Sequence, residues 1–529
     1  MNSSIPRGGA RGRALWIGGT VAAAVVLMLA YLRTAGTVPV LSDGAGLSLQ
    51  AWDMLHGNPL LHGWQATDVT FYTTELPQLM LVEAVAGLRP EVVHIGAAMT
   101  YTLLVLLAAF VARGRASGAE GLVRALLAAG VMLAPEPLAP TWILMSSPDH
   151  VGTAVPVLVL LLLLDWAGRR WYVPVLVCLV LAWAIAGDPL TLIVGVVPLA
   201  AACLLRACQG LARRQGPGGV RYELVLSAAA VVAVPVALAA DRLVPALGGF
   251  TTSRGVSGLE PLAMLPGNVR LTVRSFLALF GADFSAVHGG LDVAFAAVHL
   301  AGVALVLAAV IVAAWRLLRY LGTGSELIAD VLVIAVVGNV AGYFFAFRIT
   351  NIYAAHEIGP VLSLGAALAG RTLGGPLVRA RLRSWLMPAF AAGLACYAAM
   401  LGVAATRAQA PPQNVTLAAW LTSHDLRSGL APYWQGTSVT LDSLGRIDMV
   451  SVVADRHGRL APRHWLADMR LADPATHSAD FVVVVPGGVI TKGEALATFG
   501  RPARVYQYAG DTIMVWRENL LRHMGPPVS

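Results

Sequence analysis

Residues 151–189 read VGTAVPVLVLLLLLDWAGRRWYVPVLVCLVLAWAIAGDP, and this stretch decides the fold class. It contains two apolar runs, 151–166 and 171–187, which are separated by the pair Arg169-Arg170. As α-helices, runs of this length approach the thickness of the hydrocarbon core of a membrane, about 30 Å. The stretch therefore predicts two consecutive transmembrane helices joined by a basic turn.

The same pattern recurs along most of the 529 residues. The chain is 57% hydrophobic and only 12% charged, with a mean hydropathy of +0.70. A soluble protein carries about twice that charged fraction, and a membrane β-barrel would show short alternating segments that are absent here. We expect an α-helical polytopic membrane protein with eleven spans, at residues 14–33, 92–112, 122–141, 151–166, 171–187, 189–207, 222–240, 292–315, 327–347, 357–370 and 386–405.

The distribution of arginine predicts the orientation. With the N-terminus inside, the inner segments and their flanks carry most of the arginines before the C-terminal region, and the outer loops carry few. The outer ones are Arg33, Arg89, Arg242, Arg254, Arg270, Arg274 and Arg348. Since positive charge stays on the cytoplasmic side, we expect a cytoplasmic N-terminus, with the first span retained as a signal anchor. The net charge of +8 is thus a topology signal, and no nucleic-acid partner is expected.

Other residue counts indicate the cellular setting. Lysine occurs once, at Lys492, and this strong preference for arginine suggests a GC-rich bacterial genome. We therefore expect a location in the bacterial plasma membrane. The four cysteines lie in or beside apolar blocks, so they predict neither a disulfide framework nor a metal cluster.

Two long outer loops and a C-terminal domain interrupt the apolar pattern. Loop 34–91 contains an amphipathic helical stretch around Leu47–Leu55, which we expect to lie in the membrane interface with Trp52 and Trp64 at headgroup level. Loop 241–291 contains a shorter apolar stretch. We assign residues 1–405 to the transmembrane domain and 406–529 to an extracytoplasmic α/β domain. The latter is predicted to have a helix at 417–426 and strands at 438–441, 449–453, 481–485, 505–508 and 512–516.

Three aspartates are expected on the outer side. Asp43 follows the first span, and a partly desolvated carboxylate there can serve as general base for a hydroxyl nucleophile. The alternative is that it caps the helix that follows. Asp149, next to His150, and Asp188 stand at helix ends and have the same two interpretations. We take Asp43 and Asp149 as catalytic candidates.

Further polar residues on the outer side are candidates for substrate binding. Arg348 suits phosphate because its planar fork donates two parallel hydrogen bonds, although it can also be an arginine snorkelling at a helix end. The full set of substrate-binding candidates is His150, Glu75, Asp188, Arg348, Tyr353 and His356. No metal site is assigned from spacing.

Several short segments resemble the GT-C superfamily of integral membrane glycosyltransferases. They are Ser42-Asp43-Gly44-Ala45-Gly46-Leu47, the Gly57-Asn58-Pro59 turn, Asp149 in the second outer loop, and the helix that ends Leu368-Ala369-Gly370-Arg371. The C-terminal part, with Gly429-Leu430-Ala431-Pro432-Tyr433-Trp434, looks like the extracytoplasmic domain of actinobacterial proteins of this type. Departures are Gly44, where the family often has a second acidic residue, and His356, where an arginine was expected.

The resemblance implies an activity. It implies inverting transfer of a sugar from a polyprenyl-phosphate donor to a hydroxyl of a cell-envelope glycan acceptor on the outer face. Asp43 would be the base, and Arg348 would meet the lipid phosphate. No cofactor is expected, and dependence on a divalent metal stays open. The remaining alternatives are a transporter, which usually has ionisable groups near the midplane, and a non-catalytic scaffold or binder of lipid-linked sugars.

Overall fold

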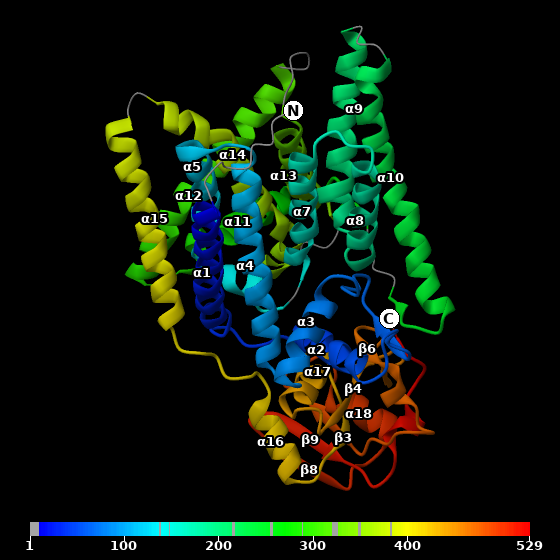
Figure 1. The fold of residues 1–529 in the computed structure, drawn as a ribbon. Coiled ribbons are helices and arrows are strands. Elements are labelled where there is room, and N and C mark those ends of the chain that lie inside the picture. Colours follow the sequence, from blue (N-terminus) through cyan, green and yellow to red (C-terminus); the bar gives the residue numbers. More distant parts are fainter. Residues whose placement is uncertain are drawn as a thin grey trace.

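The computed structural model describes residues 10–136, 139–147, 149–213, 217–253, 258–287, 289–319, 326–346, 351–380 and 383–528. Within them, nine helices are long and apolar enough to cross a membrane. They are α1 (Ala10–Ala35), α4 (Glu91–Arg113), η1 (His150–Thr153) with α7 (Ala154–Ala167), η2 (Leu192–Val196) with α9 (Val197–Ala212), α10 (Pro217–Ala246), α12 (Gly290–Arg319), α13 (Leu327–Phe345), η4 (Ile352–Ile358) with α14 (Gly359–Arg379), and α15 (Arg383–Thr406). The helices form one bundle (Figure 1).

Each of the eleven ranges predicted as spans falls on a helix. Two of these helices are shorter than the nine named above. They are α5 (Gly118–Met132) and α8 (Val173–Gly187), with 15 residues each. The range 122–141 was predicted too long at its end, because α5 stops at Met132, close to Pro135, and a separate short helix α6 (Ala139–Met145) follows. Proline disfavours helix at the residue before it, which explains the break.

Helix α14 is the centre of the bundle. It packs against α4, α5, α12 and α13, and small residues allow the close approach. A Cβ added at Gly370 would lie 2.3 Å from the Arg124 carbonyl oxygen and 2.7 Å from the Ala112 Cβ. Within this helix, which continues to Arg379, Arg371 is buried, and its guanidinium contacts the carboxylates of Asp165 and Glu326.

The C-terminal part begins with α16 (Val415–Ser423) and contains a six-stranded sheet of order β5-β4-β3-β7-β9-β8. Its strands are β3 (Ser428–Ala431), β4 (Asp448–Ala454), β5 (Leu460–Pro462), β7 (Phe481–Val484), β8 (Arg504–Tyr508) and β9 (Asp511–Val515). Strand β3 runs parallel to β4 and β7, whereas β9 is antiparallel to β7 and β8. Helix α18 (Lys492–Phe499) precedes β8.

The strand predicted at 438–441 is wrong. These residues belong to helix α17 (Tyr433–Asp442), which packs on β4. The apolar residues Val439 and Leu441 alternate with polar ones, as in a strand with one buried face. However, the helix is buried on most of its surface, so this alternation does not distinguish a strand from a helix.

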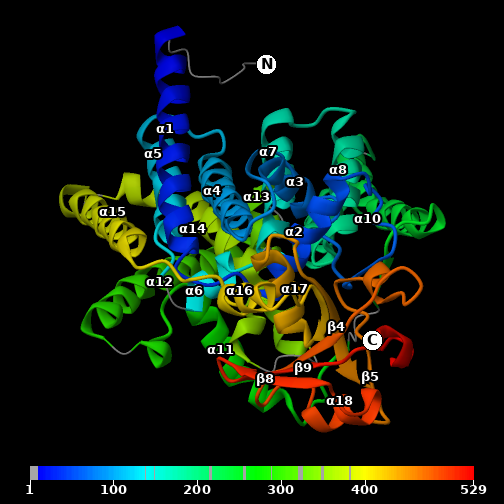
Figure 2. The same ribbon diagram turned by 90° about the horizontal axis from the view of Figure 1, so that it is seen from below.

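The first outer loop lies between the bundle and the C-terminal domain. It contains α2 (Ser42–Leu55), β1 (Trp64–Ala66) and α3 (Glu75–Ala86), and α17 packs directly on α2, as the view from below shows (Figure 2). The prediction that Trp64 lies at headgroup level is wrong. Its side chain is 6% exposed, and its indole N–H donates to Asp53, because the C-terminal domain covers this surface.

A second, small sheet joins three distant segments. Strand β1 pairs in parallel with β2 (Thr251–Thr252) of the second outer loop and in antiparallel with β6 (Ala467–Asp468) of the C-terminal domain. The second loop also contains α11 (Leu265–Leu279), which packs on α13 and η4. These contacts hold both outer loops and the C-terminal domain together around one cavity.

Candidate functional site

A cavity of about 750 Å³ lies where the outer loops, the ends of the helices and the C-terminal domain meet. Its polar lining comes from segments far apart in sequence. The charged and histidine residues that line it are Asp43, Asp68, Asp149, His150, Asp188, His356, Glu357 and Arg463. Five of the eight predicted site residues are among them: Asp43, Asp149, His150, Asp188 and His356.

Asp43 lies in the first turn of α2 and does not cap that helix. The N-cap position is Leu41, without a side-chain capping bond. Instead, the Asp43 carboxylate accepts a hydrogen bond of 2.5 Å from the phenol of Tyr433, in α17. Burial, together with the nearby Asp149, raises the pKa of Asp43 to about 6, although the Tyr433 hydrogen bond opposes the shift. The pKa of Tyr433 is also raised by burial, so the phenol keeps its proton and remains a donor.

Asp149, His150 and Asp188 come together at the start of η1. Asp149 occupies the N-cap position of η1, but its side chain makes no capping bond. Asp188, 1% exposed, accepts hydrogen bonds from His150 Nδ1 at 2.8 Å, from the Thr153 hydroxyl and from the Leu190 backbone N–H at 2.9 Å. Burial raises the pKa of Asp188, but His150 and these hydrogen bonds outweigh it, and the net shift is downward. Asp188 therefore fixes the orientation of His150.

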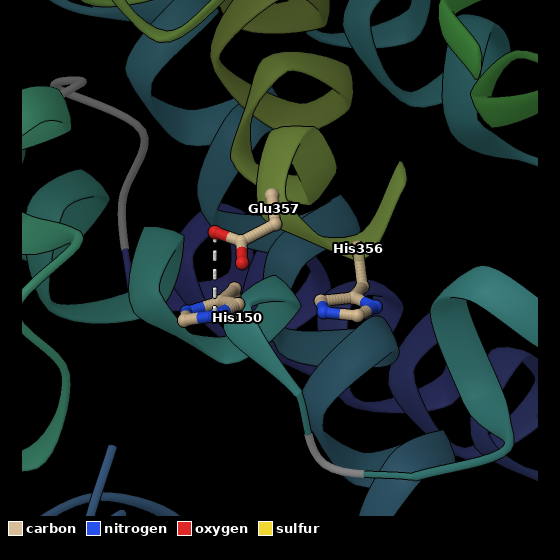
Figure 3. Close-up of side chains that lie close together, drawn as sticks. All are labelled: His150, His356 and Glu357. Carbon is tan, nitrogen blue, oxygen red and sulfur yellow. Dashed lines mark ion pairs between the residues drawn. The ribbon is translucent and has the colours of Figure 1, made fainter. Parts of the chain in front are cut away.

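His356 and Glu357, near the end of η4, lie beside His150 (Figure 3), and all three line the cavity. The rings of His150 and His356 are nearly parallel, with centroids 5.6 Å apart. The Glu357 carboxylate lies 3.5 Å from His150 Nε2. Two imidazoles and one carboxylate from two separate segments thus lie close together.

These three side chains could hold a divalent metal ion. One ligand atom from each of His150, His356 and Glu357 lies within 4.8 Å of the others. Two histidines and a glutamate are a common zinc ligand set. The hydrogen bond from His150 Nδ1 to Asp188 leaves Nε2 facing Glu357, which is the arrangement in which a carboxylate orients a metal-binding histidine.

Glu75 lies behind the cavity and does not line it in this structure. It is 5% exposed and packs against Gly152 of η1, where an added Cβ would lie 1.8 Å from Glu75 Oε1. Burial raises the pKa of Glu75 to about 8, so its carboxyl is mostly protonated at neutral pH. It thus packs against η1, the segment that begins at His150.

Two further predicted residues are not placed in the site. Tyr353 is 55% exposed and its ring packs near Trp142, with centroids 5.9 Å apart, outside the cavity lining. Arg348 lies outside the described residues.

Sequence reasoning missed the contribution of the C-terminal domain to the cavity. Tyr433, Trp434, Arg463, Trp465 and Leu466 all line it. The only sequence signal was the segment around Tyr433-Trp434, and it gave no indication that Tyr433 reaches Asp43, 390 positions earlier. Glu357 was also left out of the predicted site, although it adjoins His356.

No protein-family model matches the chain, and no curated protein matches it. Solved structures do resemble it. The oligosaccharyltransferase of Archaeoglobus fulgidus, in complex with Zn and sulfate, is 13% identical and has a TM-score of 0.51, over 94% of this chain and 72% of that one. This chain has that fold.

Two other structures are similar at lower TM-scores. The same archaeal enzyme, tethered with an acceptor peptide that contains the NVT sequon, gives 11% identity and a TM-score of 0.45, over 88% of this chain and 69% of that one. ArnT from Cupriavidus metallidurans, bound to undecaprenyl phosphate, is 16% identical and has a TM-score of 0.38, over 98% of this chain and 100% of that one. The predicted fold class, a helical polytopic membrane domain with a small C-terminal α/β region, is confirmed by the helices and the sheet, and the archaeal oligosaccharyltransferase has the same fold.

Proposed function

We propose that this protein transfers a sugar from a polyprenyl-phosphate donor to an acceptor hydroxyl on the outer face of a bacterial plasma membrane, with a cell-envelope glycan as acceptor. The observation that carries the proposal is the convergence of Asp43, Asp149 and the His150–Asp188 pair on one cavity at the ends of the apolar helices. Such a site receives a lipid tail from the bundle and a polar acceptor from the aqueous side.

Asp43 is the general base of the proposed reaction. Its raised pKa, about 6, leaves it ionised at neutral pH yet basic enough to take a proton from a hydroxyl. The acceptor oxygen attacks the anomeric carbon, the bond from that carbon to the phosphate oxygen breaks, and the proton passes to Asp43. Direct displacement of this kind inverts the configuration at the anomeric carbon.

His150, His356 and Glu357 are the residues that would hold a divalent cation. When bound, such a cation supplies charge stabilisation for phosphate oxygens. Asp188 keeps the His150 ring in the orientation that directs Nε2 toward Glu357. Asp149 lies beside this group and is available to orient the acceptor.

The test compares lipid-linked sugars in the native host for the wild type and Asp43→Asn, at equal protein level. We expect one polyprenyl-phosphate sugar to accumulate in the mutant, because the donor is made but not consumed. Asp425→Asn is the matched control, since that side chain is 84% exposed in the C-terminal domain. Unchanged lipid pools and unchanged surface glycan in Asp43→Asn would favour a non-catalytic binder of lipid-linked sugars.

A further inference from the structure

The charged side chains that line the cavity are mostly acidic. Its described lining contains five carboxylates, from Asp43, Asp68, Asp149, Asp188 and Glu357. A phosphate-bearing donor would be repelled by such a surface unless cations offset it. Among the described lining residues, the one permanent cation is the guanidinium of Arg463, from the C-terminal domain.

Within the described part of the chain, the Arg463 guanidinium makes no ion pair. It lies over the ring of Tyr433, with its central carbon 5.1 Å from the ring centroid. Arg470, seven residues later, provides the contrast, because it is paired with both Asp53 and Asp468. Arg463 therefore faces the cavity with its hydrogen-bond donors available.

The backbone holds Arg463 firmly in this position. Its N–H donates to the Ser451 carbonyl at 2.8 Å, and the carbonyl of the next residue, His464, accepts from the Ser253 hydroxyl at 2.6 Å. Four residues after Arg463, β6 pairs with β1 of the first outer loop. The segment is thus tied to the sheet on one side and to both outer loops on the other.

We propose that Arg463 binds the phosphate of the lipid donor, so that the C-terminal domain completes the donor site. This inference rests on the proposed function. The guanidinium fork donates two parallel hydrogen bonds to phosphate oxygens, a geometry that lysine does not reproduce. As the anomeric carbon–oxygen bond breaks, the electron pair stays on the phosphate, and Arg463 offsets the added negative charge. Tyr433 contacts both groups, since its ring lies under the Arg463 guanidinium and its phenol donates to Asp43.

The experiment measures binding to the purified full-length protein of three probes: a polyprenyl phosphate, the corresponding polyprenol and inorganic phosphate. We expect the wild type to prefer the polyprenyl phosphate over the other two. Arg463→Gln should weaken polyprenyl phosphate binding by roughly 10- to 100-fold, the effect of losing hydrogen bonds to a charged group, and leave polyprenol binding unchanged. Arg427→Gln, on the exposed surface of the same domain, is the matched control and should bind as the wild type does.

A second variant tests whether weaker binding results from the loss of phosphate contacts or from undocking of the C-terminal domain. Arg463→Met keeps an apolar stem against Tyr433 and removes the charge and the N–H donors, so it should lose the same preference for phosphate. Hydrogen exchange at β6 reports whether docking is intact in both variants. Unchanged affinity for the polyprenyl phosphate in docked Arg463→Gln and Arg463→Met would overturn the assignment of Arg463 and leave the proposed function standing. A wild type that binds polyprenol and polyprenyl phosphate equally would overturn both.

Discussion

At the scale of single residues, the contact between Asp43 and Tyr433 links the proposed chemistry to pH. Asp43 acts as a base only when ionised, and burial with Asp149 nearby raises its pKa to about 6. Sugar transfer should therefore decline as the pH falls through about 6. The Tyr433 hydrogen bond stabilises the carboxylate and so lowers this pKa.

Removing that hydrogen bond should move the acidic limb of the pH–rate profile to higher pH. We expect Tyr433→Phe to shift its midpoint upward by about one pH unit, since hydrogen bonds to charged groups contribute ~1.5–3 kcal/mol and one unit corresponds to about 1.4 kcal/mol. The measurement is kcat/KM against pH for wild type, Tyr433→Phe and the control Tyr508→Phe on the edge strand β8. A midpoint that stays in place, or moves downward, would mean that Asp43 is not the group whose ionisation limits the rate.

At the scale of elements, the packing of α2 on the C-terminal domain keeps Asp43 and Tyr433 together. Gly46, one turn after Asp43, makes this possible, because an added Cβ would lie 2.5 Å from Leu466 Cδ2 and 2.7 Å from Leu466 Cγ. Leu466 is buried against this helix, so its side chain would have to shift toward the cavity that it lines.

We expect Gly46→Ala to lower stability by about 1–3 kcal/mol, the usual cost of overpacking, and to loosen the domain contact. Gly402→Ala in α15 is the matched control, because nothing lies within 4 Å of an added Cβ there. Thermal unfolding gives the stability change, and hydrogen exchange at β1 and β6 reports the loosening. Equal hydrogen exchange at β1 and β6 in the two variants would show that α2 and α17 accommodate the added methyl group and stay in contact.

The elements also show what the sequence could predict. Long apolar runs identify helices such as α4 and α12 directly, because no other structure satisfies the backbone of so many apolar residues in a membrane. The prediction failed where tertiary contacts decide the structure. From sequence, residues 438–441 of α17 have the pattern of a strand, and Trp64 has that of an interfacial tryptophan. In the structure α17 packs on α2, and Trp64 lies in a strand that pairs with β6 of the C-terminal domain.

At the scale of the whole molecule, the same distinction applies to the site. Asp43, Asp149, His150 and Asp188 all line the cavity, and the sequence could group them because the predicted spans place their loops on one side. Tyr433 and Arg463 were not predictable, because no local pattern indicates which surface of the C-terminal domain docks on the first loop. The placement of Arg463 depends on the pairing of β1 with β6, two strands that lie about 400 residues apart in sequence.

The orientation of the chain is the prediction that belongs to the whole molecule. The proposed site requires the C-terminal domain on the outer side, while the arginine distribution predicts a cytoplasmic N-terminus. Both hold only if an odd number of helices cross. Asp43, Asp149 and Asp188 then share the outer side only if α5 and α8 both cross, together with the nine longer helices. We expect alkaline phosphatase fused after the C-terminus to be active and the same enzyme fused to the inner turn at Arg169-Arg170 to be inactive, with a cytoplasmic reporter giving the opposite result. Phosphatase activity at the Arg169-Arg170 turn would place that turn, and with it the Arg371–Asp165 ion pair, on the outer side and would separate the site from its acceptor.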